Sequence, residues 1–175
     1  MIDQQVEIAT KDGHTTTFIT HPERGGPFPV VIFYMDAPAI REELRDMARR
    51  LGTSGYYVML PNMYYRSGVM EIGPIPPDPD SPERKRMFAL MGSLTIPMIM
   101  DDTRALLTYA EGQAAANTKL NALLSRTSCS TGHDLCMSVG FRRHGGPRIL
   151  DLRHGQNHRK DHPCDAFMPS AWRWR

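Results

Sequence analysis

The chain has 175 residues and a net charge of +2. Hydrophobic residues make up 41% of it and charged residues 23%, which excludes a collagen-like or wholly disordered chain and suits one soluble domain. Its apolar runs fall short of the roughly 18 residues of a membrane-spanning helix. The first residues lack the pattern of a secretory signal, and three cysteines are too few for a disulfide framework, so we expect a cytoplasmic protein.

Charge and composition change near residue 119. Residues 1–119 carry 12 Lys and Arg against 15 Asp and Glu, whereas residues 120–175 carry 9 against 4. The second segment also holds all three cysteines and both tryptophans, and it contains no Glu and no Tyr. Two interpretations stay open here. The segment is either a basic tail that binds nucleic acid, or the product of a shifted reading frame and disordered.

The chain opens with a predicted β-hairpin. Residues 6–10 and 15–20 alternate in polarity and are rich in β-branched side chains. Asp12-Gly13 stands between them, and this dipeptide is a strong turn signal when it separates two such segments.

A strand, a helix and a second strand follow the hairpin. Residues 30–34 and 56–60 are continuously apolar, as strands buried on both faces are. Between them, apolar side chains recur at helical spacing from Ile40 to Leu51, and Pro38 suits the first turn of a helix. Because the connections are short, we expect a βαβ unit with parallel strands and a right-handed crossover.

Two further helices are predicted after a proline-rich loop at residues 72–82. Ser81 has the side chain of a helix N-cap, and Pro82 suits the first helical position. This helix is expected to end near Leu94, and a second one is expected from about Pro97 to Ala110.

Long segments of this order resemble the dienelactone hydrolase family, a branch of the α/β-hydrolases. The segments that carry the resemblance are residues 29–37, 40–48 and 55–66. It covers roughly residues 5–118 and implies a mostly parallel α/β-hydrolase-type sheet with flanking helices. We therefore expect residues 1–118 to form the N-terminal half of such a domain, truncated. Residues 119–175 do not match and are expected to be irregular.

The resemblance also implies a function. Family members hydrolyse small cyclic or carboxylate-bearing esters with a Cys-His-Asp triad and without cofactor or metal. The thiolate attacks the ester carbonyl, the histidine acts as general base, the aspartate orients it, and backbone N–H groups bind the oxyanion. The implied partner is a small-molecule ester, not a nucleic acid or a membrane.

Two side chains of the family, Asp36 and Arg66, transfer onto this chain, and a backbone role joins them. Asp36 matches an acidic residue that contacts the nucleophile region, more often the longer Glu in the best-known branch of the family. The alternative interpretation, a carboxylate that binds N–H groups at a helix start, stays open. Arg66 matches an arginine that binds the substrate carboxylate bidentately, or else it is a solvated loop residue. The backbone at Met35 and Ala37 matches half of the oxyanion hole.

The nucleophile is matched less closely. Cys136 lies in Leu135-Cys136-Met137-Ser138, and Cys-Met-Ser is a sequence that the family often has, but Asp134 stands where a glycine is expected. Cys129 is a second candidate. A nucleophile elbow needs small neighbours because its turn is strained, so ordinary free cysteines are the alternative.

The remaining triad partners have weak support, because no buried strand precedes them in the sequence. The candidates are Asp151, His154, His158, His162 and Asp165. The three histidines have the spacing of a zinc site with Cys164, but Gly155 and Pro163 disfavour a helix there. The alternative function is therefore an inactive, truncated and frameshifted remnant with no catalytic triad, and translation of the other reading frames tests it.

Overall fold

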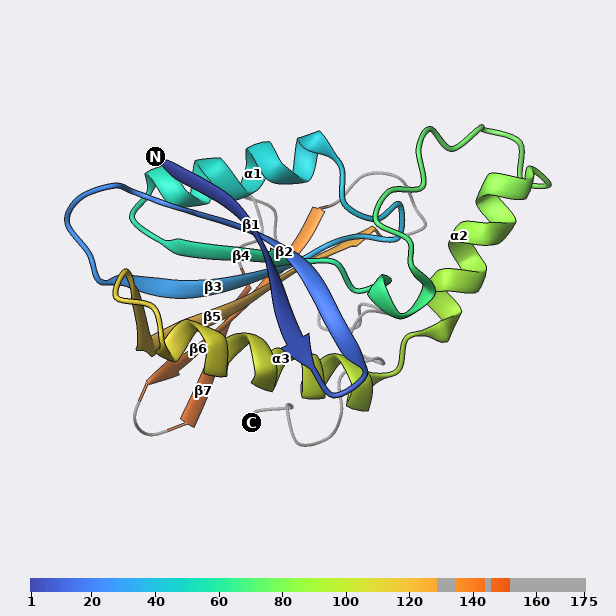
Figure 1. Cartoon of the computed structure of the whole chain (residues 1–175). Coiled ribbons are helices and arrows are strands. Elements are labelled where there is room, and N and C mark those ends of the chain that lie inside the picture. Colours follow the sequence, from blue (N-terminus) through green and yellow to red (C-terminus); the bar gives the residue numbers. More distant parts are fainter. Residues whose placement is uncertain (129–134, 144–145, 152–175) are drawn as a thin grey trace.

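The computed structural model of the protein describes residues 1–128, 135–143 and 146–151, and it describes side chains as far as residue 119. One sheet has the strand order β1-β2-β4-β3-β5-β6-β7 (Figure 1). Its strands are β1 Ile2–Thr10, β2 Gly13–His21, β3 Phe28–Tyr34, β4 Tyr57–Pro61, β5 Ala116–Ser128, β6 Leu135–Arg143 and β7 Gly146–Asp151. The helices are α1 Glu42–Thr53, α2 Pro82–Ser93, α3 Ile96–Glu111 and a short 3-10 helix, η1, at Tyr65–Ser67.

The predicted hairpin is confirmed and is longer than expected. β1 pairs antiparallel with β2 over its whole length, from the Ile2–His21 pair to the Thr10–Gly13 pair. Gly13 has a φ of 140°, a conformation that side-chain-bearing residues rarely adopt, and Thr10 Oγ1 donates a hydrogen bond of 3.0 Å to its carbonyl oxygen. The hairpin joins the rest of the sheet because β2 pairs antiparallel with β4.

The predicted βαβ unit is also confirmed. β3 and β4 are parallel, α1 connects them, and β5 adds to the other side of β3 in parallel. Alternate residues of β3 face opposite cores: Val31 and Phe33 belong to the core under α1, and Val30 and Ile32 to the core under α3. β3 is therefore buried on both faces, as its apolar run predicts.

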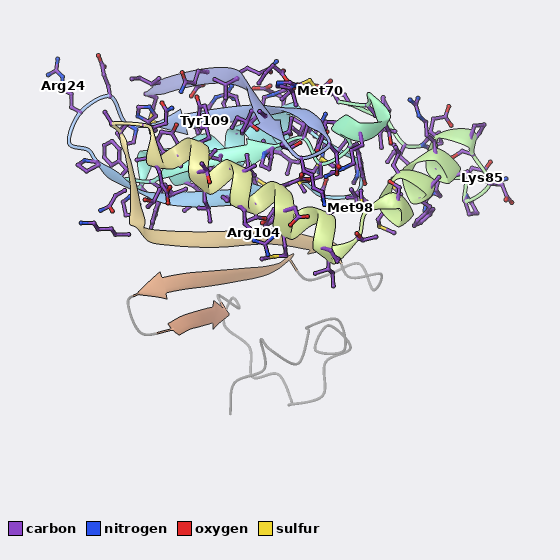
Figure 2. All side chains as sticks on the ribbon, turned by 60° about the horizontal axis from the view of Figure 1, so that its bottom comes forward. Arg24, Met70, Lys85, Met98, Arg104 and Tyr109 are labelled. Atoms are coloured by element: carbon purple, nitrogen blue, oxygen red, sulfur yellow. The ribbon has the colours of Figure 1, made fainter. Side chains whose placement is uncertain are left out.

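Helices cover the two faces of the sheet. α1 buries Leu44 and Ala48 against one face, and α3 buries Leu106 and Ala110 against the other. Figure 2 shows α3 crossing its face of the sheet, with α2 lying beyond the edge of the sheet. None of the helices in the described part of the chain is long and apolar enough to cross a lipid bilayer.

The start of α1 differs from the prediction. Pro38 was expected in the first helical turn, but the structure places it in a tight turn, and the helix begins at Glu42. The Ala39 N–H donates a hydrogen bond of 3.0 Å to the Asp36 carbonyl, and Ala39 has a φ of 71°. This left-handed residue stops the helix from extending back to Pro38.

The start of α2 follows the predicted capping chemistry. The Ser81 side chain accepts a hydrogen bond of 3.3 Å from the Arg84 N–H, and Pro82 is the first residue of α2. Thr95 caps α3 in the same way, through a 3.4 Å bond from the Met98 N–H.

Regular structure extends past the predicted boundary at residue 118. β5 continues to Ser128, β6 pairs antiparallel with β5, and β7 pairs antiparallel with β6. The apolar sequence at residues 122–124 explains the continuation, since it lies in register with residues 31–33 of the buried strand β3. The expected irregular tail therefore contains three stretches of strand, at residues 119–128, 135–143 and 146–151.

Candidate active site

Two loops that follow parallel strands lie at one edge of the sheet. β3 and β4 are adjacent and parallel, so the segments after them, which carry Asp36 and Arg66, both leave from the same carboxyl edge. In open α/β sheets, ligands bind outside this edge, where successive connections pass to opposite faces. Here the connection after β3 forms α1 on one face, and the connection after β4 leads to α3 on the other.

The turn after β3 presents a backbone donor. The hydrogen bond of this turn joins Ala39 to Asp36, so it does not use the N–H of Ala37, and Pro38 has no N–H. The Ala37 carbonyl accepts a hydrogen bond of 3.1 Å from the Tyr64 hydroxyl, which fixes the peptide from the β4 side. An alanine at positive φ costs about 1–2 kcal/mol, and such strain clusters at functional sites. The role of this turn as half of an oxyanion hole stays a prediction.

Asp36 is bound by Arg41, the residue that precedes α1. Arg41 donates through Nη1 to Asp36 Oδ1 and through Nη2 to Oδ2, the second bond measuring 2.8 Å. The bonds to Asp36 raise the pKa of the Arg41 guanidinium above its ordinary value. The predicted carboxylate therefore lies beside the Ala37 turn with its charge balanced locally.

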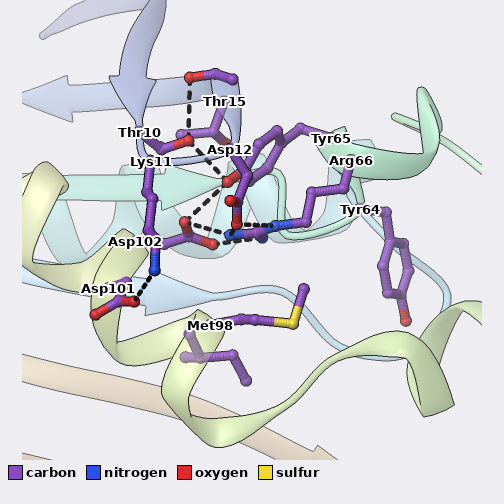
Figure 3. Close-up of polar contacts among 12 residues, drawn as sticks. Thr10, Lys11, Asp12, Thr15, Tyr64, Tyr65, Arg66, Met98, Asp101 and Asp102 are labelled. Carbon is purple, nitrogen blue, oxygen red and sulfur yellow. Dashed lines mark hydrogen bonds and ion pairs between the residues drawn. The ribbon is translucent and has the colours of Figure 1, made fainter.

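Arg66 lies in η1 and is bound by two carboxylates (Figure 3). Its Nη1 and Nη2 donate to the two oxygens of Asp102 at 2.8 and 2.9 Å, and its Nε donates to Asp12 Oδ2 at 2.8 Å. The Arg66 side chain is only 16% exposed, so it is not the solvated loop arginine of the alternative interpretation. The hydrogen bonds that Arg66 donates to Asp102 raise the pKa of the guanidinium.

Tyr65 connects the same cluster to the hairpin. Its hydroxyl donates to Asp102 Oδ1 at 2.9 Å and shares a hydrogen bond of 2.7 Å with Thr10 Oγ1. The Arg66 guanidinium lies 4.4 Å above the centre of the Tyr65 ring, within range of a cation–π contact. Burial raises the pKa of Tyr65 to about 12, so the hydroxyl keeps its proton at neutral pH.

Sequence reasoning singled out Arg66 but missed Asp102, although a signal was present. Asp102, Leu106 and Ala110 follow at helical spacing and are all buried on α3. A carboxylate on the apolar stripe of a helix is rare unless it is paired, so its position alone predicts a cationic partner.

Of the two candidate cysteines, Cys136 is the one within the described part of the chain. Cys136 lies inside β6, opposite Thr127 of β5. Asp151 is the last residue of β7. The other tail candidates lie outside the described residues, and these are Cys129, His154, His158, His162, Cys164 and Asp165. The roles of the cysteines, and the zinc alternative, stay predictions.

Comparisons with known proteins match the amino-terminal part of the chain. Residues 15–123 match the model of the dienelactone hydrolase family. A Methylorubrum extorquens protein, provisionally named carboxymethylenebutenolidase, is 26% identical over 119 residues, which make up 67% of this chain and 38% of that protein. A Yersinia pestis protein with the same name is 31% identical over 65 residues, or 37% of this chain and 24% of that protein.

A solved structure shares the fold. The crystal structure of a Klebsiella pneumoniae protein, provisionally described as a dienelactone hydrolase, matches with a TM-score of 0.60 at 19% identity, over 71% of this chain and 49% of that one. The chain thus spans about two fifths of the Methylorubrum protein and about half of the Klebsiella chain. Because the family model matches more than half of its residues, the chain belongs to the dienelactone hydrolase family.

Proposed function

We propose that the chain carries the oxyanion-binding and substrate-carboxylate-binding part of a site that hydrolyses small, carboxylate-bearing esters. One observation carries the proposal: a single short segment links the two functions. Tyr64 holds the Ala37 peptide through its hydroxyl, and Arg66 follows two residues later in the same loop. The Ala37 N–H, as the donor for an oxyanion, and the Arg66 guanidinium, as the cation for a carboxylate, are therefore positioned by the same segment of chain.

The names of the relatives agree with this substrate class. A butenolide is a cyclic ester, and the carboxymethylene group in the name of the Methylorubrum and Yersinia proteins adds a carboxylate to it. We extend this class to the present chain because the guanidinium of Arg66 has the planar geometry that pairs with a carboxylate.

The proposed reaction proceeds through a thioester. A cysteine thiolate, proposed to be that of Cys136, attacks the ester carbonyl, and the carbonyl oxygen becomes an oxyanion that accepts a hydrogen bond from the Ala37 N–H. The ester C–O bond then breaks, the leaving alkoxide takes up the proton that the thiol released, and water hydrolyses the thioester to the acid and regenerates the thiol. One such donor is worth about 10²–10³ in rate. Arg41 supports this step because it neutralises Asp36, whose charge would otherwise oppose the oxyanion beside it.

The test is an esterase assay with two chromogenic substrates, para-nitrophenyl acetate and the mono-para-nitrophenyl ester of succinate. We expect the wild-type chain to prefer the succinate ester, because only that ester carries a carboxylate for Arg66. Arg66→Lys is expected to reduce the preference, since an ammonium lacks the planar fork. Cys136→Ala is expected to abolish turnover, and Cys129→Ala is expected to retain it.

A second candidate, the inactive remnant, is favoured by the position of Cys136. An elbow places its nucleophile on a sharp turn between a strand and a helix, whereas Cys136 lies within a strand. A chain that melts cooperatively but releases no nitrophenol above the buffer rate would support the remnant and overturn the proposed hydrolase.

A further inference from the structure

We infer that Asp12 is the exchangeable partner of Arg66: a ligand carboxylate binds the arginine by replacing the Asp12 carboxylate, while Asp102 holds the arginine in place. The inference rests on the proposed function, because it concerns the same arginine. The new element is that Asp12, on the β1–β2 hairpin, competes with the ligand for Arg66 and so sets the affinity of the site for an anion.

The two carboxylates on Arg66 differ in exposure. The Asp102 side chain is 1% exposed, whereas the Asp12 side chain is 42% exposed at the tip of the hairpin. Figure 3 shows them on different sides of the guanidinium. A ligand arriving from solvent therefore meets Asp12 and not Asp102.

The two carboxylates also use different donors. Asp102 binds the end of the guanidinium, through Nη1 and Nη2. Asp12 binds its side with a single oxygen, which lies 2.8 Å from Nε and 2.7 Å from Nη2. A carboxylate prefers a pair of parallel N–H groups. The pair at Nε and Nη2 is occupied by the exposed Asp12 carboxylate, so a ligand can take this pair by displacing Asp12. Replacing Asp12 gives the ligand a bidentate site without disturbing the buried pair.

Asp102 is held far more firmly than Asp12. The Tyr65 hydroxyl donates to it at 2.9 Å, and its place on α3 is fixed by the packing of that helix. Its release would leave a buried charge unpaired, which is strongly unfavourable. Asp12 leaves by rotation of one exposed side chain, and an exposed ion pair is weak. The backbone of the hairpin tip need not move, because the contact of Thr10 with Tyr65 keeps it in place.

Neutralising Asp12 should therefore strengthen anion binding. Asp12→Asn removes the competing charge, and asparagine before glycine is itself a favoured hairpin turn, so the fold is expected to persist. Asp101→Asn is the matched control. It removes the same charge from the residue next to Asp102, but Asp101 pairs with Lys11, at 3.8 Å, and with Arg104, not with Arg66.

The experiment is a calorimetric titration of each variant with succinate at low salt. We expect Asp12→Asn to bind succinate about fivefold more tightly than wild type, the factor that corresponds to losing one exposed ion pair. Asp101→Asn is expected to stay within about twofold of wild type, and Arg66→Lys is expected to weaken binding in either background. Equal gains from Asp12→Asn and Asp101→Asn would overturn the inference, since they would show a general charge effect. Absence of succinate binding in both wild type and Asp12→Asn would overturn it as well.

Binding and turnover separate this inference from the proposed function. A chain that hydrolyses neither ester but shows the gain specific to Asp12→Asn supports the exchange and contradicts only the hydrolase. A chain that hydrolyses the succinate ester with the same KM in wild type and Asp12→Asn supports the hydrolase and contradicts the exchange.

Discussion

Two arginine–aspartate pairs stand at the same edge of the sheet, and they differ in how far apart their partners lie in the chain. Arg41 and Asp36 are five residues apart and belong to one loop. Arg66 and Asp102 are 36 residues apart and join η1, after β4, to α3 on the far face of the sheet. Both pairs are bidentate, so their local geometry is alike.

The difference lies in what each pair holds together. The Arg41–Asp36 pair spans a loop that the turn from Asp36 to Ala39 already closes, and Arg41 is 30% exposed, so water can replace its partner. The Arg66–Asp102 pair connects two elements that are otherwise held by packing, and its arginine is 16% exposed, whereas the carboxylates of both pairs are buried. An ion pair of the same geometry should therefore contribute more to stability in the second place than in the first.

The largest expected effect comes from breaking the long-range pair. We expect Asp102→Asn to lower the free energy of unfolding by about 3 kcal/mol, because Arg66 loses its buried partner and keeps only Asp12. Asp36→Asn is expected to cost about 1 kcal/mol, since Arg41 can turn to solvent. Urea unfolding at neutral pH measures both values.

A double-mutant cycle sharpens the same comparison. Pairing each aspartate variant with Arg66→Met or Arg41→Met isolates the coupling energy of each pair from the cost of its single changes. We expect the coupling of Arg66 with Asp102 to exceed that of Arg41 with Asp36. Equal coupling energies would contradict the idea that sequence separation and burial determine how much each ion pair contributes to the free energy of unfolding.

The fold was largely predictable wherever the signal is local. The Asp12-Gly13 turn, the apolar run at residues 30–34 and the Ser81 cap each act over a few residues, and each appears in the structure as expected. The start of α1 was missed because two local preferences compete there. Pro38 suits a helical first turn, but the turn that ends at Ala39 takes precedence, and the helix begins after it.

The site was predictable only in part, because its contacts join residues that are far apart in the sequence. Asp36, Ala37 and Arg66 came from a resemblance between segments, which needs no knowledge of contacts. The partners of Arg66 are a hairpin tip and a helix that lie 54 and 36 residues away, and no spacing rule joins them. Only the charge at Asp102 on an apolar stripe pointed to a buried partner, without saying which one.

A second tether of α3 lies beside Asp102 and gives a pH-dependent prediction. The Tyr34 hydroxyl, at the end of β3, shares a hydrogen bond of 2.5 Å with Thr103 Oγ1. Burial raises the pKa of Tyr34 from 10.0 to about 12. The unfolded chain therefore loses this proton first as pH rises, so the stabilisation is complete below about pH 10 and is lost between about pH 10 and 12.

We expect this loss to be about 3 kcal/mol, from the usual conversion of a pKa difference into free energy. Urea unfolding of wild type and Tyr34→Phe across that pH range measures it. The phenylalanine variant is expected to be less stable at neutral pH, because Thr103 loses a partner, and to lose less stability above pH 10. Parallel pH profiles for the two proteins would show that Tyr34 does not titrate as described.

The smallest expected effect concerns the hairpin tip that brings Asp12 to Arg66. Gly13 has a φ of 140°, and a Cβ built on it would lie 3.7 Å from Tyr65 Cε2, an ordinary contact. Gly13→Ala should thus cost backbone strain and not a clash, about 1 kcal/mol after allowing for the smaller entropy of the unfolded chain. Gly112→Ala is the control, because Gly112 has a φ of −82° that alanine adopts freely. Gly112→Ala should change the free energy of unfolding by less than about 0.5 kcal/mol. If Gly13→Ala were as stable as Gly112→Ala, the hairpin tip would have relaxed around the alanine, and the position of Asp12 would not depend on this turn.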